Sequence, residues 1–583
     1  MPLPKRTVFR RLVRNLGLLM HEHQVGPDAL VGSVLSLWCS ESFPGLKESE
    51  LPALAVVRES PAARKFAAFL KAEDFLEGSY WLSSAYALLS GESERKKLAM
   101  YFTPPSLTKR LLDDLEVSGV EFDKGTFCDP ACGGAAFLAP IALRIRDALR
   151  ARGTPPRQII RHVHAHLLGF DKDETLCKLS RHFLVMALRD EVLAAQLTPA
   201  FCVEQANSLL QTTRVHGTVD VVVCNPPFRK MASAEAQLYG DDYADVIEAQ
   251  PNIYALFIGL CVKLLATNGV CALVTPTSFL SGQYFSKVRT LLLTETSILS
   301  IGMVGDRKGV FIDVEQETAL TIARRVSHPQ AQGTSTDVCV VSRHGDYVDV
   351  GQCALPNSGA AWPIPRSEFD VRLLRSAANS TARIANYGYV VRIGSFVWNR
   401  DTRTVYPSAK CAAESKDGPA VPLLWSSDVK ADGVLVFDGR PKSNKEPCFV
   451  NLGSKSHASV VRRPSVLLQR VTSNDQPKRL IAAAVPKEFI DTYGGFVGEN
   501  HTVILEQATD HPVLPPNLMA ELLRVPTTDR YFRCISGATN VSAFELNQLV
   551  LPSPELLLAR LASGMSMADA AQRALDDLPS ARS

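Results

Sequence analysis

The chain has 583 residues, of which 46% are hydrophobic and 21% are charged. This length is too great for one hydrophobic core and predicts two or three domains, while the composition excludes fibrous and wholly disordered classes. The formal net charge is only +3, so a polyanionic partner would have to be held by local basic patches rather than by the field of the whole surface.

Cysteine usage and hydropathy indicate the cellular compartment in which the protein is expected. The thirteen cysteines are scattered through apolar runs without paired CxxC spacing, which favours a reducing compartment and leads us to expect no metal site. No apolar run reaches the length of about 18 residues that a membrane span needs, so we expect no span and a cytoplasmic, bacterial-type location. The amino terminus lacks a small-residue cleavage site and is interpreted as a helix, whose basic residues form a solvated face or, alternatively, touch phosphate: Lys5, Arg6, Arg10, Arg11 and Arg14.

Residues 1–95 show helical periodicity and few strand signals, which predicts a helical amino-terminal region. The next segment, MYFTPPSLTKRLLDDL, contains Thr103, which can cap a helix, and two prolines that suit a first helical turn. After it, GTFCDPACGGAAFLAP predicts a strand that ends at Asp129, a tight turn of small residues and a helix. Such a turn lets a ligand approach a helix amino terminus. It lacks both the dinucleotide fingerprint and a triphosphate-binding lysine, and a turn without a ligand remains the alternative.

A second strand is predicted in HAHLLGFDKDETLCKLSRHFLVMAL, ending at Asp171. An acid at this place can accept both ribose hydroxyls of an adenosine cofactor, while helix capping by Asp171 or Asp173 is the alternative. Three histidines alternate as they would on a strand, but no acidic or cysteine partner lies nearby in sequence, so a metal site is disfavoured: His162, His164 and His166.

The stretch VDVVVCNPPF carries the most information. Its β-branched run predicts a buried parallel strand that presents Asn225 at the carboxyl edge of a sheet, where open α/β sheets bind ligands. Pro226 and Pro227 make the following loop rigid and leave its carbonyls free. Together with Phe228, the loop offers an amide oxygen, a carbonyl and an aromatic face. This combination suits an amino group on a flat ring.

Strand and helix patterns alternate from FCVEQANSLL to ETALTIARR, which predicts an α/β fold with a doubly wound, mostly parallel sheet. From about Ser327 the sequence becomes turn-rich, with short strand-like runs and basic loops, and indicates a mixed, β-rich second domain. We therefore expect a helical region at 1–95, the sheet domain at 96–330, a linker and the start of the second domain at 331–380, and the rest of that domain at 381–583.

The order of these motifs is more specific than any one of them. From Tyr101 to about Arg325 the sequence resembles the gamma class of S-adenosylmethionine-dependent DNA adenine-N6 methyltransferases, in which a TPP-type motif is followed by DPACGxG, an acidic strand end and NPPY or NPPF. The carboxyl-terminal half resembles, more loosely, the target-recognition domains of type II enzymes. The resemblance implies methyl transfer to an adenine flipped out of double-stranded DNA, within a restriction-modification system.

The resemblance also implies a role for individual residues. The methionine part of S-adenosylmethionine would be surrounded by Thr103, Asp129, Ala131, Cys132 and Gly133. Asp171 would bind the ribose, and Asn207 and Phe257 the adenine of the cofactor. The catalytic loop would be Asn225, Pro226, Pro227 and Phe228, with Phe228 and Phe311 stacking on the flipped base. A place in the hydrophobic core is the alternative for Phe311. Ala135 departs from the family's second glycine, and its methyl group is expected to crowd the cofactor.

Two other functions remain open at this stage. One is methylation of RNA or of a protein glutamine, and the other is a catalytically weak DNA-binding subunit. A cognate restriction endonuclease is a candidate partner, and the sequence does not address the oligomeric state. Nor does it decide which basic or aromatic residue of the second domain reads a base: Arg392, Trp398, Arg400 or Arg470.

Overall fold

The computed structural model describes residues 4–46, 60–197, 199–306, 309–313, 315–327, 335–356, 358–415, 418–437, 447–452, 457–536 and 539–577. The chain forms two compact units, and each is described by itself. The first comprises Met1–Phe279 and Tyr284–Gly359, and the second comprises Leu280–Gln283 and Ala360–Ser583. Among the described helices, none combines the length and the apolar character that crossing a membrane requires.

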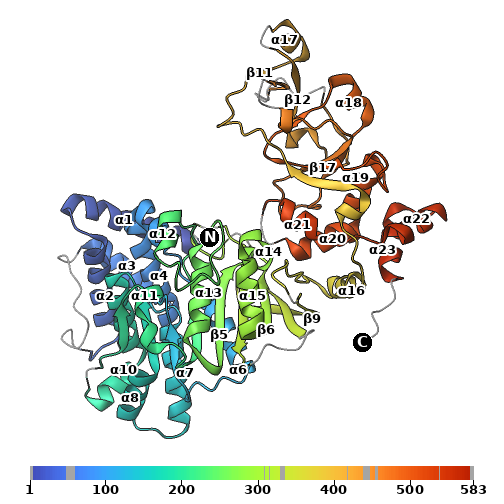
Figure 1. Cartoon of the computed structure of the whole chain (residues 1–583). Helices are drawn as coiled ribbons and strands as arrows, with labels where there is room; N and C mark the ends of the chain where they lie inside the picture. Colours follow the sequence, from blue (N-terminus) through green and yellow to red (C-terminus); the bar gives the residue numbers. More distant parts are fainter. Residues whose placement is uncertain are drawn as a thin grey trace. The chain divides into compact units, whose positions relative to one another are not determined.

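The amino-terminal region is helical, as expected, and is coloured blue in Figure 1. Ser60 caps α3 through a hydrogen bond from Ala63 N at 3.1 Å, and Asp74 caps α4. The aromatic rings of Phe9 and Trp81 pack with centroids 4.7 Å apart and tie the first helix to the fourth. These helices are α1 (Lys5–His23), α2 (Pro27–Ser42), α3 (Pro61–Lys71), α4 (Phe75–Leu89) and α5 (Gly91–Leu98).

A nine-stranded sheet forms the centre of the first unit, in the order β3-β2-β1-β4-β5-β7-β6-β8-β9. Strands β1 to β5 run parallel, while β7 lies antiparallel between β5 and β6. The chain passes outward from β1 through β2 to β3 and then returns to β4, so the strand order reverses between β1 and β4 and a ligand crevice is expected there. The strands are β1 (Phe127–Asp129), β2 (Leu167–Asp171), β3 (Cys202–Gln205), β4 (Val219–Cys224), β5 (Leu265–Pro276), β6 (Thr296–Val304), β7 (Thr318–Arg325), β8 (Ser335–Val341) and β9 (Tyr347–Ala354).

Helices connect these strands and cover the sheet, with α13 packed against β4 and β5 and α15 against β6 (Figure 1). The doubly wound α/β fold expected from the alternating pattern is therefore confirmed. The helices are α6 (Pro105–Val117), α7 (Leu138–Ala151), α8 (Pro156–His166), α9 (Glu174–Ala187), α10 (Arg189–Ala195), α11 (Ser208–Gln211), α12 (Ser233–Gln237), α13 (Ile253–Leu264), α14 (Ser278–Ser281) and α15 (Ser286–Glu295).

Two local expectations were wrong. The three histidines lie in α8 rather than on a strand, because Ile159, Ile160 and Val163 give that segment a buried helical stripe. The rings of His162 and His166, one turn apart, stack with centroids 4.2 Å apart. Thr103 does not cap a helix either, since Pro104 is the N-cap residue of α6 and the Thr103 hydroxyl lies one residue too early.

The first unit extends further than the boundary expected at residue 330. Within the presumed linker, β8 pairs in parallel with β6, and β9 pairs antiparallel with β8, so both strands enlarge the central sheet. They were missed because an edge hairpin needs few apolar residues: β9 exposes Tyr347, Val348 and Asp349 and buries only alternate positions further along. The two units divide after Gly359.

The second unit contains two four-stranded sheets, with orders β10-β17-β14-β15 and β11-β13-β12-β16. The mixed, β-rich character expected for this unit is confirmed. The unit also contains helices near its carboxyl end, which were not expected. The strands are β10 (Tyr389–Ile393), β11 (Val405–Tyr406), β12 (Ala420–Leu424), β13 (Phe449–Asn451), β14 (Ser465–Gln469), β15 (Ala482–Val485), β16 (Val497–Gly498) and β17 (Thr502–Gln507). The helices are α16 (Glu368–Ala377), α17 (Ala409–Glu414), α18 (Lys487–Tyr493), α19 (Pro516–Arg524), α20 (Pro526–Ile535), α21 (Ala543–Gln548), α22 (Pro554–Ala562) and α23 (Met567–Asp576).

Candidate active site

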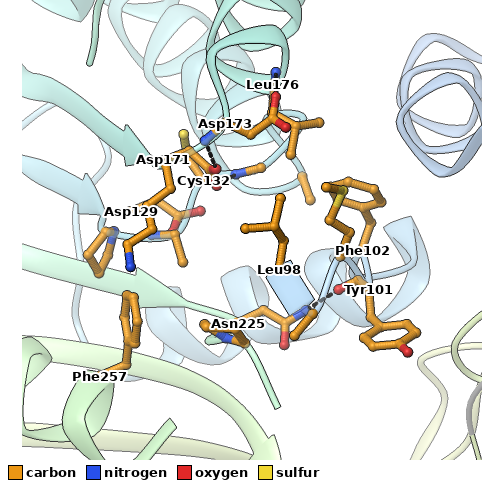
Figure 2. Close-up of a pocket in the computed structure, with 18 of the residues that line it drawn as sticks. Leu98, Tyr101, Phe102, Asp129, Cys132, Asp171, Asp173, Leu176, Asn225 and Phe257 are labelled. Atoms are coloured by element: carbon orange, nitrogen blue, oxygen red, sulfur yellow. Dashed lines mark hydrogen bonds between the residues drawn. The ribbon is translucent and has the colours of Figure 1, made fainter. Parts of the chain in front are cut away.

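A pocket lies at the carboxyl ends of β1, β2 and β4, where the strand order reverses. Figure 2 shows Asp129 and Asp171 on one side of it, Asn225 and Tyr101 on another, and the side chain of Leu98 between them. Most of the residues that the sequence proposed for a cofactor and a catalytic loop line this pocket: Thr103, Asp129, Ala131, Cys132, Gly133, Asp171, Asn225, Pro227 and Phe257.

Asn225 follows the last residue of the buried strand β4 and is held in one orientation. Its Nδ2 donates a hydrogen bond to the main-chain carbonyl of Tyr101 at 3.0 Å, drawn as a dashed line in Figure 2. The Oδ1 atom is buried and accepts no hydrogen bond from the described residues. A buried acceptor without a donor is costly, so this oxygen is poised to accept a hydrogen bond from a ligand.

Two acids end β1 and β2. Asp129 is 1% exposed, and its Oδ1 accepts a hydrogen bond from Ala131 N at 3.0 Å. Burial raises the pKa of Asp129 to about 8, and the nearby charge of Asp171 acts in the same direction. The loss of surrounding water likewise raises the pKa of Asp171 to about 6, although Gly133 N and Asp173 N each donate to its carboxylate at 2.9 Å. A positively charged ligand beside these two carboxyl groups would stabilise their ionised forms and lower both pKa values.

Polar atoms without partners also mark the region of the third strand and the TPP motif. Asn207 donates through Nδ2 to the Tyr239 hydroxyl at 3.3 Å, whereas its Oδ1 is buried and unpartnered among the described residues. The Thr103 hydroxyl is also buried and has no hydrogen-bond partner among the described residues. Asn207 is outside the described lining of the pocket, but the next residue, Ser208, lines it. Phe257, on α13 and 6% exposed, supplies an aromatic face.

The two rings expected to hold a flipped base are in contact with each other. Phe228 and Phe311 lie edge to face, with centroids 6.1 Å apart and an interplanar angle of 89°. Tyr254 makes a similar contact with Phe228 at 6.2 Å. Phe311 is only 2% exposed, and neither Phe228, Phe311 nor Pro226 is among the described residues that line the pocket. In this conformation the rings therefore touch rather than enclose an open slot.

Several lining residues were missed from the sequence. The largest group is the segment from the end of α5 to the TPP motif, which crosses the pocket after Ala99 takes a left-handed φ of 51°. Another is Arg229, whose guanidinium pairs with Glu235 of α12 at 2.7 Å. Arg229 directly follows the NPPF motif in the sequence, and this position could have indicated that it lines the pocket. The missed residues include Lys97, Leu98, Met100, Tyr101, Phe102, Lys172, Leu176, Ser208, Arg229 and Ile253.

The position of Ala135 differs from the expectation that its methyl group crowds the cofactor. It is buried, with a left-handed φ of 61° that favours glycine. It lines a second cavity of about 440 Å³, together with Ser79 and Tyr80, and is outside the described lining of the first. At Gly134 a Cβ would come within 1.9 Å of Ser83 Oγ, so this glycine is required by close packing. The departure from the motif thus strains the backbone of the turn.

The reversal of strand order, the pocket at that point and the acids at its strand ends define a ligand-binding protein of the doubly wound α/β class. Comparison with known proteins narrows this class. Residues 166–311 match the family described as Eco57I restriction-modification methylase. This part of the chain is therefore similar to that family of methylases.

Individual relatives agree with this assignment. The type II methyltransferase M.BsuBI of Bacillus subtilis is 23% identical over 343 residues, which are 58% of this chain and 66% of that protein. M.AccI of Acinetobacter calcoaceticus is 22% identical over 230 residues, which are 38% of this chain and 35% of that protein. Each of these alignments covers less than two thirds of the relative's own length. In fold, the chain is similar to the type IIL restriction-modification enzyme MmeI, solved in complex with DNA, with a TM-score of 0.56 at 13% identity over 97% of this chain and 89% of that one.

Proposed function

We propose that this protein transfers a methyl group from S-adenosylmethionine to the N6 amino group of an adenine flipped out of a specific double-stranded DNA sequence. It would act as the cytoplasmic modification enzyme of a restriction-modification system, beside a cognate endonuclease. The observation that carries the proposal is the buried, unpartnered Oδ1 of Asn225 at the end of β4, held in place by the hydrogen bond from Nδ2 to Tyr101. An exocyclic amino group is the donor that this oxygen lacks.

The residues of the pocket fit the cofactor. Asp171 can accept hydrogen bonds from the ribose hydroxyls of the cofactor. The unpartnered Oδ1 of Asn207 and the ring of Phe257 can contact the adenine of the cofactor. The unpartnered Thr103 hydroxyl can donate to a carboxylate, and Asp129 would meet a positive charge. When bound, the cofactor would supply an electrophilic methyl group on a positively charged sulfur.

The catalytic loop would act on the amino nitrogen, which is a poor nucleophile because its lone pair is delocalised into the ring. Asn225 Oδ1 and the Pro226 carbonyl would accept the two amino protons and so favour a more pyramidal nitrogen with its lone pair restored. These acceptors also meet the positive charge that develops on nitrogen during transfer. Because Tyr101 fixes the amide beforehand, no reorientation of Asn225 is needed at that moment.

Flipping the adenine out of the duplex costs roughly a few kcal/mol, which stacking on Phe228 and Phe311 would offset. In the second unit, proposed as the target-recognition domain, two of the basic candidates already have partners. Arg392 pairs with Glu506 at 2.5 Å, and Arg470 donates to the Asn500 carbonyl at 2.8 Å. Trp398 and Arg400 are exposed, which favours them for contact with base edges in the major groove.

The test is to incubate the purified chain with labelled cofactor and genomic DNA, and then to sequence the DNA by a method that senses methylated bases. We expect N6-methyladenine at one recurrent sequence. Label on cytosine, or label on RNA or on a protein glutamine in parallel reactions without DNA, would contradict the proposal. DNA binding without any transfer would instead support the alternative of a catalytically weak subunit.

A further inference from the structure

The basic face of α1 reaches the loop that carries Phe311. Arg6 donates through Nη2 to the main-chain carbonyls of Gly309 and Val310, the second at 3.2 Å. One turn later, Arg10 forms an ion pair with Asp313 Oδ1. The sequence favoured a solvated face or phosphate contacts for these arginines. The structure leaves these arginines exposed, and two of them also hold residues on both sides of Phe311.

Asp313 receives a second arginine from another helix. Arg95, on α5 and with a side chain only 12% exposed, lies 3.3 Å from Asp313 Oδ2. Its guanidinium carbon also lies 5.6 Å from the ring centroid of Tyr101. Tyr101 is the residue whose carbonyl orients Asn225. Asp313 takes a left-handed φ of 59°, which aspartate tolerates better than most residues. The two oxygens of one carboxylate therefore join α1, α5 and the Phe311 loop.

Phe311 lies in the segment between these contacts. Its ring meets the edge of Phe228 at 6.1 Å, and Ile312, between it and Asp313, lines a small cavity with Arg95 and Tyr101. A single exposed ion pair stabilises little. Here two arginines converge on one carboxylate, and a third holds two carbonyls at the other end of the loop, so the loop is fixed at both sides of the ring.

We propose that Arg6, Arg10, Arg95 and Asp313 form a clasp that positions Phe311 for the target base. They are positioning residues, because they act on the base through Phe311 and do not touch the reacting atoms. This inference rests on the proposed function for the role of Phe311. The contacts of the clasp itself need neither cofactor nor DNA.

The clasp is tested first without any substrate. In Asp313→Asn, the side chain keeps its size and its tolerance of a left-handed φ but loses both ion pairs. Hydrogen exchange of residues 309–313, followed by mass spectrometry, is expected to become roughly fivefold faster in this variant and in Arg10→Ala. The matched control is Lys5→Ala, which removes one positive charge from the same helix but breaks an ion pair with Glu73 instead. Exchange as slow as in Lys5→Ala would overturn the clasp.

The second measurement is methyl transfer to the DNA sequence that the wild-type enzyme modifies. We expect kcat to fall about tenfold in Asp313→Asn, with the cofactor Kd unchanged, and Arg10→Lys to retain most of the activity lost in Arg10→Ala. Faster exchange with an unchanged kcat would overturn the positioning role. If the wild type methylates no DNA while exchange still quickens, the proposed function fails and the clasp stands.

Discussion

The side chain of Asn225 donates through Nδ2 to the main-chain carbonyl of Tyr101, 124 residues earlier in the chain, at 3.0 Å. This bond joins the segment before the TPP motif to the end of β4. It also decides which way the amide faces, because a carbonyl can only accept. The oxygen of the amide is therefore left for a ligand.

Asn225→Ala is expected to lower kcat for methyl transfer by about 10²–10³-fold, since it removes a preoriented acceptor for the charge that develops on nitrogen. The cofactor Kd, measured by isothermal titration, should stay within about threefold of the wild type. Loss of cofactor binding would mean that Asn225 belongs to the cofactor's pocket and not to the base.

Asn225→Asp sharpens this test. The carboxylate has nearly the same size and still offers an acceptor, but it cannot donate to Tyr101 and faces that carbonyl with like partial charge. We expect activity between those of the wild type and Asn225→Ala. Activity equal to the wild type would show that the hydrogen bond to Tyr101 does not orient the amide.

The sequence predicted the strand ends of this site well. Buried apolar runs that end at Asp171 or just before Asn225 specify both a strand and the edge where the polar side chain appears. It could not predict the role of Tyr101, because the contact uses a main-chain carbonyl, which every residue has. The partner of Arg10 on α1 could not be predicted for a related reason: Asp313 lies in a loop far along the chain.

Phe257→Leu is expected to weaken cofactor binding about tenfold, because an aromatic face is replaced by a smaller aliphatic one. Leucine keeps the buried position on α13 apolar and limits the cavity that alanine would leave. Phe311→Leu is the matched control, since Phe311 is outside the described lining of the cofactor pocket. Equal loss of affinity in both variants would contradict the separate roles of the two rings.

Asp129 should make the free protein less stable as the pH rises. Its pKa in the folded state, raised by burial to about 8, exceeds the ordinary value of 3.8, so folding favours the protonated form. That contribution is fully present below pH 3.8, weakens above it and is lost once the pH has passed about 8.

Asp129→Asn removes this dependence while keeping an oxygen that can accept from Ala131 N. The melting temperature of the variant minus that of the wild type is expected to be small near pH 4 and to grow until about pH 8. Differential scanning fluorimetry across this range, without cofactor, gives the difference directly. A difference that does not vary with pH would show that Asp129 stays ionised in the folded protein.

Ala135→Gly separates backbone strain from crowding of the cofactor. A left-handed φ costs alanine about 1 kcal/mol or more, and the greater freedom of glycine in the unfolded chain offsets part of the gain. We therefore expect the free energy of unfolding to rise by about 0.5 kcal/mol, with the cofactor Kd unchanged, because the residue lines the second cavity. Ala135→Val, with a branched side chain at the same φ, should be less stable by about 2 kcal/mol. Denaturant unfolding measures both variants, and tighter cofactor binding in Ala135→Gly would show that the methyl group crowds the pocket after all.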